Sequence, residues 1–117
     1  MISRDELEEM FENMSLQSNW DMSKAKLWGY YFFHPERTAL DDAALLLAAR
    51  GYHIVDIYLS RKRDVREADR WWLHVEQIEM HTADSLDERN RLLSRFAADQ
   101  GLQAYDGMDV GHPPTHH

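Results

Sequence analysis

The sequence contains no cysteine and only three prolines among its 117 residues. Without thiols the chain can form neither a disulfide framework nor a thiolate zinc site, and such a composition suits a reducing compartment. Apolar runs are short as well, because the longest, residues 27–33 and 43–49, fall far below the ~20 residues of a membrane-spanning helix. We therefore expect one soluble, cytoplasmic protein that contacts no membrane.

Basic residues are scarce relative to acidic ones. The chain has 13 Lys and Arg against 21 Asp and Glu, which gives a formal charge of −8 with His neutral. Nucleic-acid-binding surfaces depend on clustered Lys and Arg, so direct binding of nucleic acid is not expected. The connection 61–70 is locally basic but is predicted to be a solvated hairpin loop. A protein with a basic surface is the partner that this charge favours.

Motifs of the common catalytic sites are also absent. There is no cysteine nucleophile, no G-x-S-x-G and no phosphate-binding glycine loop. We therefore predict that the protein is not an enzyme and uses no cofactor. One alternative stays open, a small metal-dependent or hydrolytic enzyme, because imidazole and carboxylate groups on the third predicted strand suit divalent metals. Its residues would be His74, Glu76, Glu79 and His81. Since one strand face supplies only two ligands, no metal site is predicted.

Three segments have the periodicity of amphipathic helices. They span residues 3–17, 38–50 and 82–100. The first has capping-box spacing at Ser3 and Glu6, and its outer face is acidic. The third has the same spacing at Ser85 and Glu88. Glycines at positions 51 and 101 are placed to end the second and third helices.

Four segments are predicted to be strands, from their aromatic and β-branched residues or their alternation. They are residues 24–33, 52–60, 71–81 and 102–105. In the third, Leu73 and Val75 share one parity and Ile78 and Met80 share the other. A β-bulge near residues 76–77 would bring both pairs to one face, so an irregularity is predicted there.

The order of these elements predicts an α+β fold. It is that of a ferredoxin-like split βαβ sandwich, with a four-stranded antiparallel sheet, two helices on one face and an additional N-terminal acidic helix. Right-handed crossovers would place the first and third strands in the centre. We assign residues 1–19 to the acidic amphipathic helix, 20–111 to the ferredoxin-like domain, and 112–117 to a flexible tail rich in His and Pro.

The segment after the last predicted strand is the most distinctive. Asp106-Gly107 is typical of a tight turn. The apolar Met108 and Val110 that follow are unusual in a tail, and two interpretations stay open: they fold back over the edge of the sheet, or they present a contact surface.

Several short segments, in their order along the chain, resemble a known family. They are Leu27-Trp28-Gly29-Tyr30-Tyr31-Phe32-Phe33, Gly51-Tyr52, Leu73-His74-Val75-Glu76 and Tyr105-Asp106-Gly107. Over about residues 20–111 the chain resembles the regulator of ribonuclease E activity B family. The resemblance implies a ferredoxin-like fold and a non-catalytic inhibitor that binds ribonuclease E. It also implies structural roles for Gly51, Tyr52, Tyr105, Asp106 and Gly107.

The first functional hypothesis is therefore an acidic module that docks on ribonuclease E or another RNA-processing protein. Its candidate partner-binding residues are Glu8, Glu9 and Glu12 on the first helix and Glu76 and Glu79 on the third strand. Their negative charge would steer association with a basic segment. A homodimer formed through the sheet also stays open, because the chain is rich in aromatic residues for its size. The residues behind that hypothesis are Trp28, Tyr30, Trp71 and Trp72.

Overall fold

The computed structural model describes residues 2–17, 20–60, 66 and 68–113. Most of the predicted 61–70 loop and of the predicted 112–117 tail therefore lies outside the described residues. Seven elements follow one another along the chain: α1 (Arg4–Gln17), β1 (Lys26–His34), α2 (Arg37–Ala49), β2 (His53–Leu59), β3 (Trp71–Glu79), α3 (Ala83–Asp99) and β4 (Ala104–Gly111). No helix in the described ranges has the length and apolar character needed to cross a bilayer.

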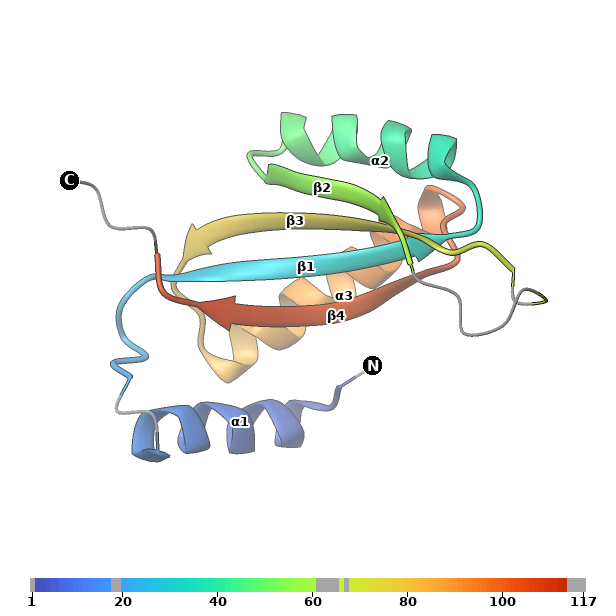
Figure 1. Ribbon diagram of the computed structural model, residues 1–117. Helices are drawn as coiled ribbons and strands as arrows, with labels where there is room; N and C mark the ends of the chain where they lie inside the picture. Colours follow the sequence, from blue (N-terminus) through green and yellow to red (C-terminus); the bar gives the residue numbers. More distant parts are fainter. Residues whose placement is uncertain (1, 18–19, 61–65, 67, 114–117) are drawn as a thin grey trace.

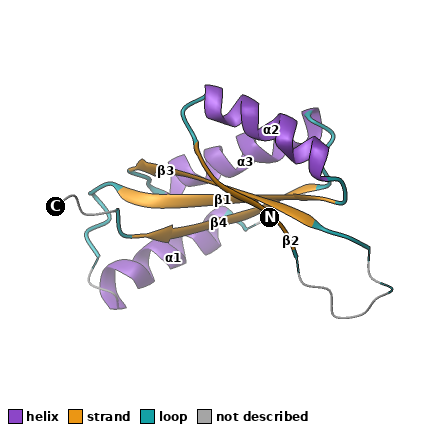
Figure 2. Cartoon of the chain, turned by 45° about the horizontal axis from the view of Figure 1, so that its top comes forward, coloured by secondary structure: helices purple, strands orange, loops and turns teal. Residues whose placement is uncertain are grey.

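The four strands form one antiparallel sheet in the order β2-β3-β1-β4. The first and third strands are central, as the crossover rule predicts. Helices α2 and α3 cover one face, and α1 lies beside α3 on the β4 side of the sheet (Figures 1 and 2). The predicted α+β fold is confirmed.

The core lies between the sheet and its helices. Trp28, Tyr30 and Phe32 of β1 are fully buried, because alternate residues of a strand point to the same face. Leu7 of α1 is also fully buried, and the ring of Phe11 stacks on Trp28 with centroids 5.9 Å apart. The N-terminal helix therefore packs on the sandwich through an apolar stripe and leaves its acidic face outside.

The aromatic residues behind the homodimer hypothesis do not share one surface. Trp28 and Tyr30 belong to the core, whereas Trp71 and Trp72 are half-buried. Because Trp71 and Trp72 are consecutive strand residues, they also point to opposite faces. Trp28 and Tyr30 therefore serve to fill the core and do not form part of an exposed dimer surface.

Short side chains cap the starts of α1 and α3, whereas Glu36 at the start of α2 makes no side-chain cap hydrogen bond. At α1 the predicted capping box is confirmed, since the Glu6 amide donates to Ser3 Oγ at 3.2 Å and the Ser3 amide donates to Glu6 Oε1 at 3.4 Å. At α3 the prediction is wrong by one turn. The cap is Thr82, whose Oγ1 accepts from the Ser85 amide at 3.1 Å while Ser85 Oγ accepts from the Thr82 amide at 2.8 Å. The helix starts at Ala83, so Ser85 is its third residue and not its cap.

The bulge predicted near residues 76–77 is wrong. Strand β3 pairs with β1 without a register shift, from Trp71 opposite His34 to Glu79 opposite Lys26. The strict period of two therefore leaves Ile78 on the face opposite the core, and it is 52% exposed. The irregularity lies instead in β2, next to residue 55, where the register with β3 shifts. As a result residues 54 and 57 pack toward the core, and the regular alternation predicted for residues 52–60 does not hold.

The tight turn predicted at Asp106-Gly107 is also wrong. Tyr105 pairs with Phe32 and Gly107 with Tyr31, so Asp106 is an extra residue within β4. This is a β-bulge, and Gly107 has a φ of 138°, which side-chain-bearing residues rarely adopt. Strand β4 continues to Gly111, well beyond the predicted end at residue 105. Residues 108 and 110 are strand residues packed against the core, which neither earlier interpretation described.

Candidate protein-docking face

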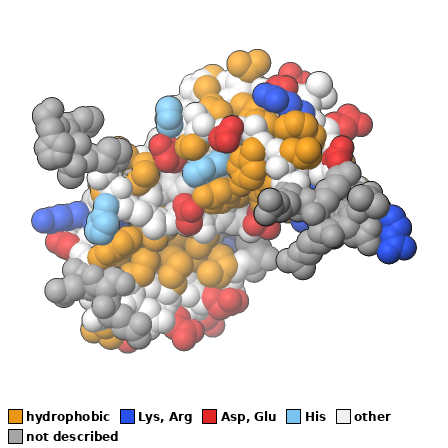
Figure 3. All heavy atoms as spheres, in the orientation of Figure 1, with side chains coloured by type: hydrophobic (Ala, Val, Ile, Leu, Met, Phe, Trp, Pro, Cys, Tyr) orange, Lys and Arg blue, Asp and Glu red, His pale blue; other side chains and the backbone are white. Residues whose placement is uncertain are grey.

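The face of the sheet opposite the helices carries exposed and half-buried side chains from all four strands. We call it the open face and define it by Tyr31, Phe33, Asp56, Tyr58, Trp72, His74, Glu76 and Asp109. Strand alternation places them there, because their neighbours Tyr30, Phe32, Leu73 and Val75 are buried on the other side. Figure 3 looks onto this face, where hydrophobic side chains lie among carboxylates and histidines.

Two pairs of rings lie across the central strands of the open face. Tyr31 stacks on His74 with ring centroids 4.3 Å apart and 14° between the planes. Phe33 contacts Trp72 with centroids 5.2 Å apart. The guanidinium carbon of Arg70 lies 4.5 Å from the centroid of the Phe33 ring, within the range of a cation–π contact.

A carboxylate from the edge strand reaches into this aromatic group. The Tyr31 hydroxyl donates to Asp109 Oδ2 at 2.6 Å. Gly29 leaves room for this approach, because a Cβ at position 29 would overlap the Asp109 carboxylate and come within 2.8 Å of His74 Nε2. The missing side chain of Gly29 thus lets groups from β3 and β4 converge over β1.

The strand positions of the open face are rich in carboxylates, which include those of Asp56, Glu76 and Asp109. Burial raises the pKa of the Tyr58 phenol, and the carboxylates of Asp56, Asp106 and Asp109 raise that pKa further because they disfavour a phenolate. Burial also raises the pKa of Tyr31, and the hydrogen bond to Asp109 adds to the effect. All four strands are described throughout, and none of their positions on this face carries Lys or Arg.

A cavity of about 410 Å³ is hollowed beside the bulge in β4. On the open face it is lined by Tyr31, Trp72, Asp106 and Gly107. It continues round the edge of β4 to Ile2, Asn90, Tyr105 and Met108. The bulge that sequence reasoning took for a turn therefore forms one wall of a cavity.

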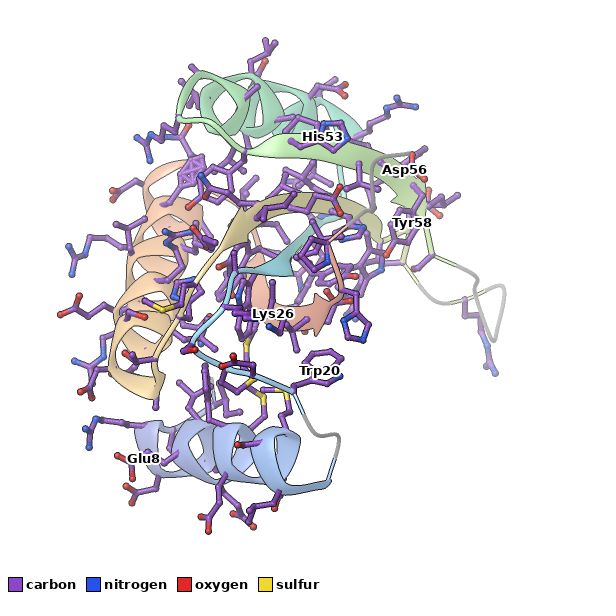
Figure 4. The ribbon with its side chains drawn as sticks, turned by 90° about the vertical axis from the view of Figure 1, so that its left-hand side faces the viewer. Glu8, Trp20, Lys26, His53, Asp56 and Tyr58 are labelled. Carbon is purple, nitrogen blue, oxygen red and sulfur yellow. The ribbon has the colours of Figure 1, made fainter. Side chains whose placement is uncertain are left out.

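The five candidate partner-binding carboxylates lie in three different places. Glu8, Glu9 and Glu12 are exposed on α1, and Figure 4 shows Glu8 far from Asp56 and Tyr58 of β2. Glu76 lies on the open face, with Oε1 4.0 Å from His53 Nε2. Glu79 lies on the opposite face, in the layer between the sheet and α3.

Glu79 is the centre of a polar network in that layer. Its Oε1 accepts from Arg89 Nη1 at 2.7 Å and from the Tyr30 hydroxyl at 2.6 Å, and His81 Nε2 lies 2.7 Å away. Burial by itself would raise the pKa of Glu79, but the hydrogen bonds from His81, Tyr30 and Arg89 outweigh it and lower the pKa to about 2. Sequence reasoning missed Arg89, although it lies one helical turn after Ser85, whose Oγ is 2.9 Å from His81 Nδ1.

The sheet separates the four residues of the enzyme alternative. His74 and Glu76 face outward, whereas Glu79 and His81 lie in the buried layer. Within the described ranges no three His, Asp or Glu side chains gather closely enough to hold a metal ion.

The residues with expected structural roles occupy defined positions. Gly51 has a φ of 97° and follows Arg50, the C-cap residue of α2. Tyr52 is buried, with its ring centroid 6.0 Å from that of Tyr30. The Tyr105 hydroxyl donates to Asn90 Oδ1 at 2.6 Å. Asp106 and Gly107 form the bulge described above.

The family model described as Regulator of ribonuclease activity B matches residues 4–110, from the start of α1 to the penultimate residue of β4. The chain belongs to the regulator of ribonuclease activity B family. No curated protein matches it. Membership of this family supports a regulatory role on a ribonuclease, and the matched range includes both the acidic helix and every residue of the open face.

Proposed function

We propose that this protein is a non-catalytic inhibitor of ribonuclease E that acts by binding the nuclease. The observation that carries this proposal is the family match over residues 4–110, which is nearly the whole chain. The absence of cysteine suits a reducing compartment, and we place the interaction in the cytoplasm.

Charge supports a basic segment of the nuclease as the docking partner. The chain has a formal charge of −8. Glu8, Glu9 and Glu12 are exposed on α1, and Glu76 is part of the open face. Such charges accelerate association with a basic partner, and their effect weakens with salt. Glu79 is held by side chains of the chain itself, so we give it a positioning role rather than a direct contact.

Purified chain and purified ribonuclease E test the proposal. RNA cleavage by the nuclease is measured with increasing amounts of the chain, and binding is measured in parallel at low and moderate salt. We expect cleavage to slow as the complex forms and the complex to weaken as salt rises. The chain alone, incubated with the same RNA, should leave it intact.

Two results would contradict the proposal. If ribonuclease E is neither bound nor slowed at either salt concentration, the proposed inhibition is wrong. If the chain alone cleaves the RNA, the non-catalytic assignment is wrong. A Glu8→Gln, Glu9→Gln, Glu12→Gln variant then measures how much the α1 charges contribute to the association rate.

A further inference from the structure

We infer that the open face recognises arginine side chains of an extended protein segment. This inference rests on the proposed function only in taking a protein as the partner. It specifies the surface and the chemistry of the segment that this surface binds.

The open face combines the two groups that a guanidinium prefers. Its rings, Tyr31 with His74 and Phe33 with Trp72, provide flat surfaces for stacking. Carboxylates from β2, β3 and β4 lie among these rings, at Asp56, Glu76 and Asp109. A planar guanidinium can stack on an aromatic ring and at the same time donate two hydrogen bonds to a carboxylate, whereas the compact ammonium group of lysine cannot.

The chain itself shows that one end of this face accepts a guanidinium. Arg70, which precedes β3, lies over the ring of Phe33 at 4.5 Å. The Tyr31 hydroxyl and the Asp109 carboxylate lie 2.6 Å apart on the same face. No strand position of the open face carries a Lys or Arg that could pair with them in the way Arg70 pairs with Phe33. We assign the Asp109 carboxylate the role of binding a partner's guanidinium, because it lies beside the Tyr31 ring and its Oδ2 already accepts a hydrogen bond from the Tyr31 hydroxyl on this face.

The cavity beside the β4 bulge gives such a side chain a place to enter. Its volume of about 410 Å³ falls within the range of about 300–1,000 Å³ that is usual for ligand pockets. The aromatic residues Tyr31 and Trp72 and the acidic Asp106 are among the residues that line it. Gly107 has no side chain, so at this position only the backbone of β4 lines the cavity and the space beside it stays empty.

A sheet face with exposed rings can also stack nucleic-acid bases, so the charge decides between the two partners. Phosphates would meet the carboxylates of Asp56, Glu76 and Asp109, with no Lys or Arg at the strand positions of this face to neutralise them. The same carboxylates attract arginine. A protein segment is therefore favoured over RNA.

Peptide titrations test the inference. The probes are a synthetic peptide of alternating Arg and Ser, the same peptide with every Arg replaced by Lys, and single-stranded oligouridine. Binding is followed by calorimetry and by chemical-shift changes of the Trp72 indole at low salt. We expect the Arg peptide to bind about tenfold more tightly than the Lys peptide, because only guanidinium groups combine stacking with bidentate hydrogen bonds.

Two double variants locate the site. Glu76→Gln with Asp109→Asn removes two negative charges from the open face, and Glu9→Gln with Glu12→Gln removes two from α1. We expect the first to weaken Arg-peptide binding about tenfold and the second to change it less than about twofold. Circular dichroism checks that both variants fold. Equal losses in the two variants, equal affinities for the Arg and Lys peptides, or preferential binding of oligouridine would each overturn the inference.

Competition with ribonuclease E separates this inference from the proposed function. If the chain inhibits the nuclease but the Arg peptide neither binds the open face nor competes, the arginine site is wrong and the proposed function stands. If the Arg peptide binds the open face but ribonuclease E is neither bound nor slowed, the proposed function is wrong and the arginine site stands.

Discussion

The ring of Tyr31 lies on the imidazole of His74, with centroids 4.3 Å apart and the planes only 14° from parallel. The two residues are direct partners on the central strands β1 and β3. Neither is covered by a helix, although on their other face the same two strands carry fully buried residues, the aromatic Trp28, Tyr30 and Phe32 of β1 and the aliphatic Leu73 and Val75 of β3. This contact therefore belongs to a structured outer surface rather than to the core.

Gly29→Ala tests the close approach of the Asp109 and His74 side chains over the backbone of Gly29. The new Cβ would meet the Asp109 carboxylate and His74 Nε2. Both are ends of flexible side chains that can swing aside, so we expect a modest fall of about 1 kcal/mol in the free energy of unfolding. The larger effect should be the loss of the Tyr31–His74 stack, measured as a change in the ring chemical shifts of both residues.

Gly111→Ala is the matched control, because a Cβ there would meet nothing within 4 Å. It should leave urea denaturation and the ring shifts unchanged. If Gly29→Ala behaves in the same way, Gly29 is not needed for the convergence of Asp109 and His74.

A pair of threonine substitutions tests the face assignment in β3. Val75 is fully buried, so Val75→Thr buries a hydroxyl among apolar side chains and should lower the free energy of unfolding by about 1–3 kcal/mol. Ile78 is 52% exposed on the other face. Ile78→Thr should therefore change the free energy of unfolding by less than about 0.5 kcal/mol. Urea denaturation of both variants measures the difference. A large loss for Ile78→Thr would instead support the β-bulge that the sequence predicted.

The ion pair between Glu79 and Arg89 is expected to contribute strongly to stability. Glu79→Gln removes the charge that compensates Arg89 in a largely buried layer, where Arg89 Nη1 and Glu79 Oε1 are 2.7 Å apart. We expect a loss of about 2 kcal/mol in the free energy of unfolding. Glu76→Gln on the open face is the control and should cost less than about 0.5 kcal/mol. Similar values for both variants would contradict a structural role for Glu79.

The low pKa of Glu79 predicts a specific dependence of stability on pH. Because its pKa is lowered from 4.5 to about 2 on folding, its ionised form stabilises the native state above pH 4.5, and this contribution is lost as the pH falls toward 2. The difference in urea midpoint between the natural chain and Glu79→Gln should therefore be greatest near neutral pH and shrink across that interval. A difference that stays constant from pH 6 to about 2 would show that ionisation of Glu79 does not contribute.

Most of the secondary structure and the strand order followed from the sequence. Apolar residues three and four apart, capping residues and the glycine after α2 define helices through local geometry, which a short window of sequence contains. The central positions of β1 and β3 followed from the handedness of the crossovers. The net charge of −8 is likewise a property of composition alone.

The tertiary structure decided where the irregularities lie and which groups meet. The bulges occur next to residue 55 and at Asp106, not near residues 76–77, because a register shift depends on how two strands pair and not on the pattern of one strand. Glu76 and Glu79 are three residues apart, yet one joins the acidic open face and the other binds Arg89 in the interior. The sequence thus determined an acidic α+β protein, and only the packing of helices on one face of the sheet decided which of its carboxylates remain available to a partner.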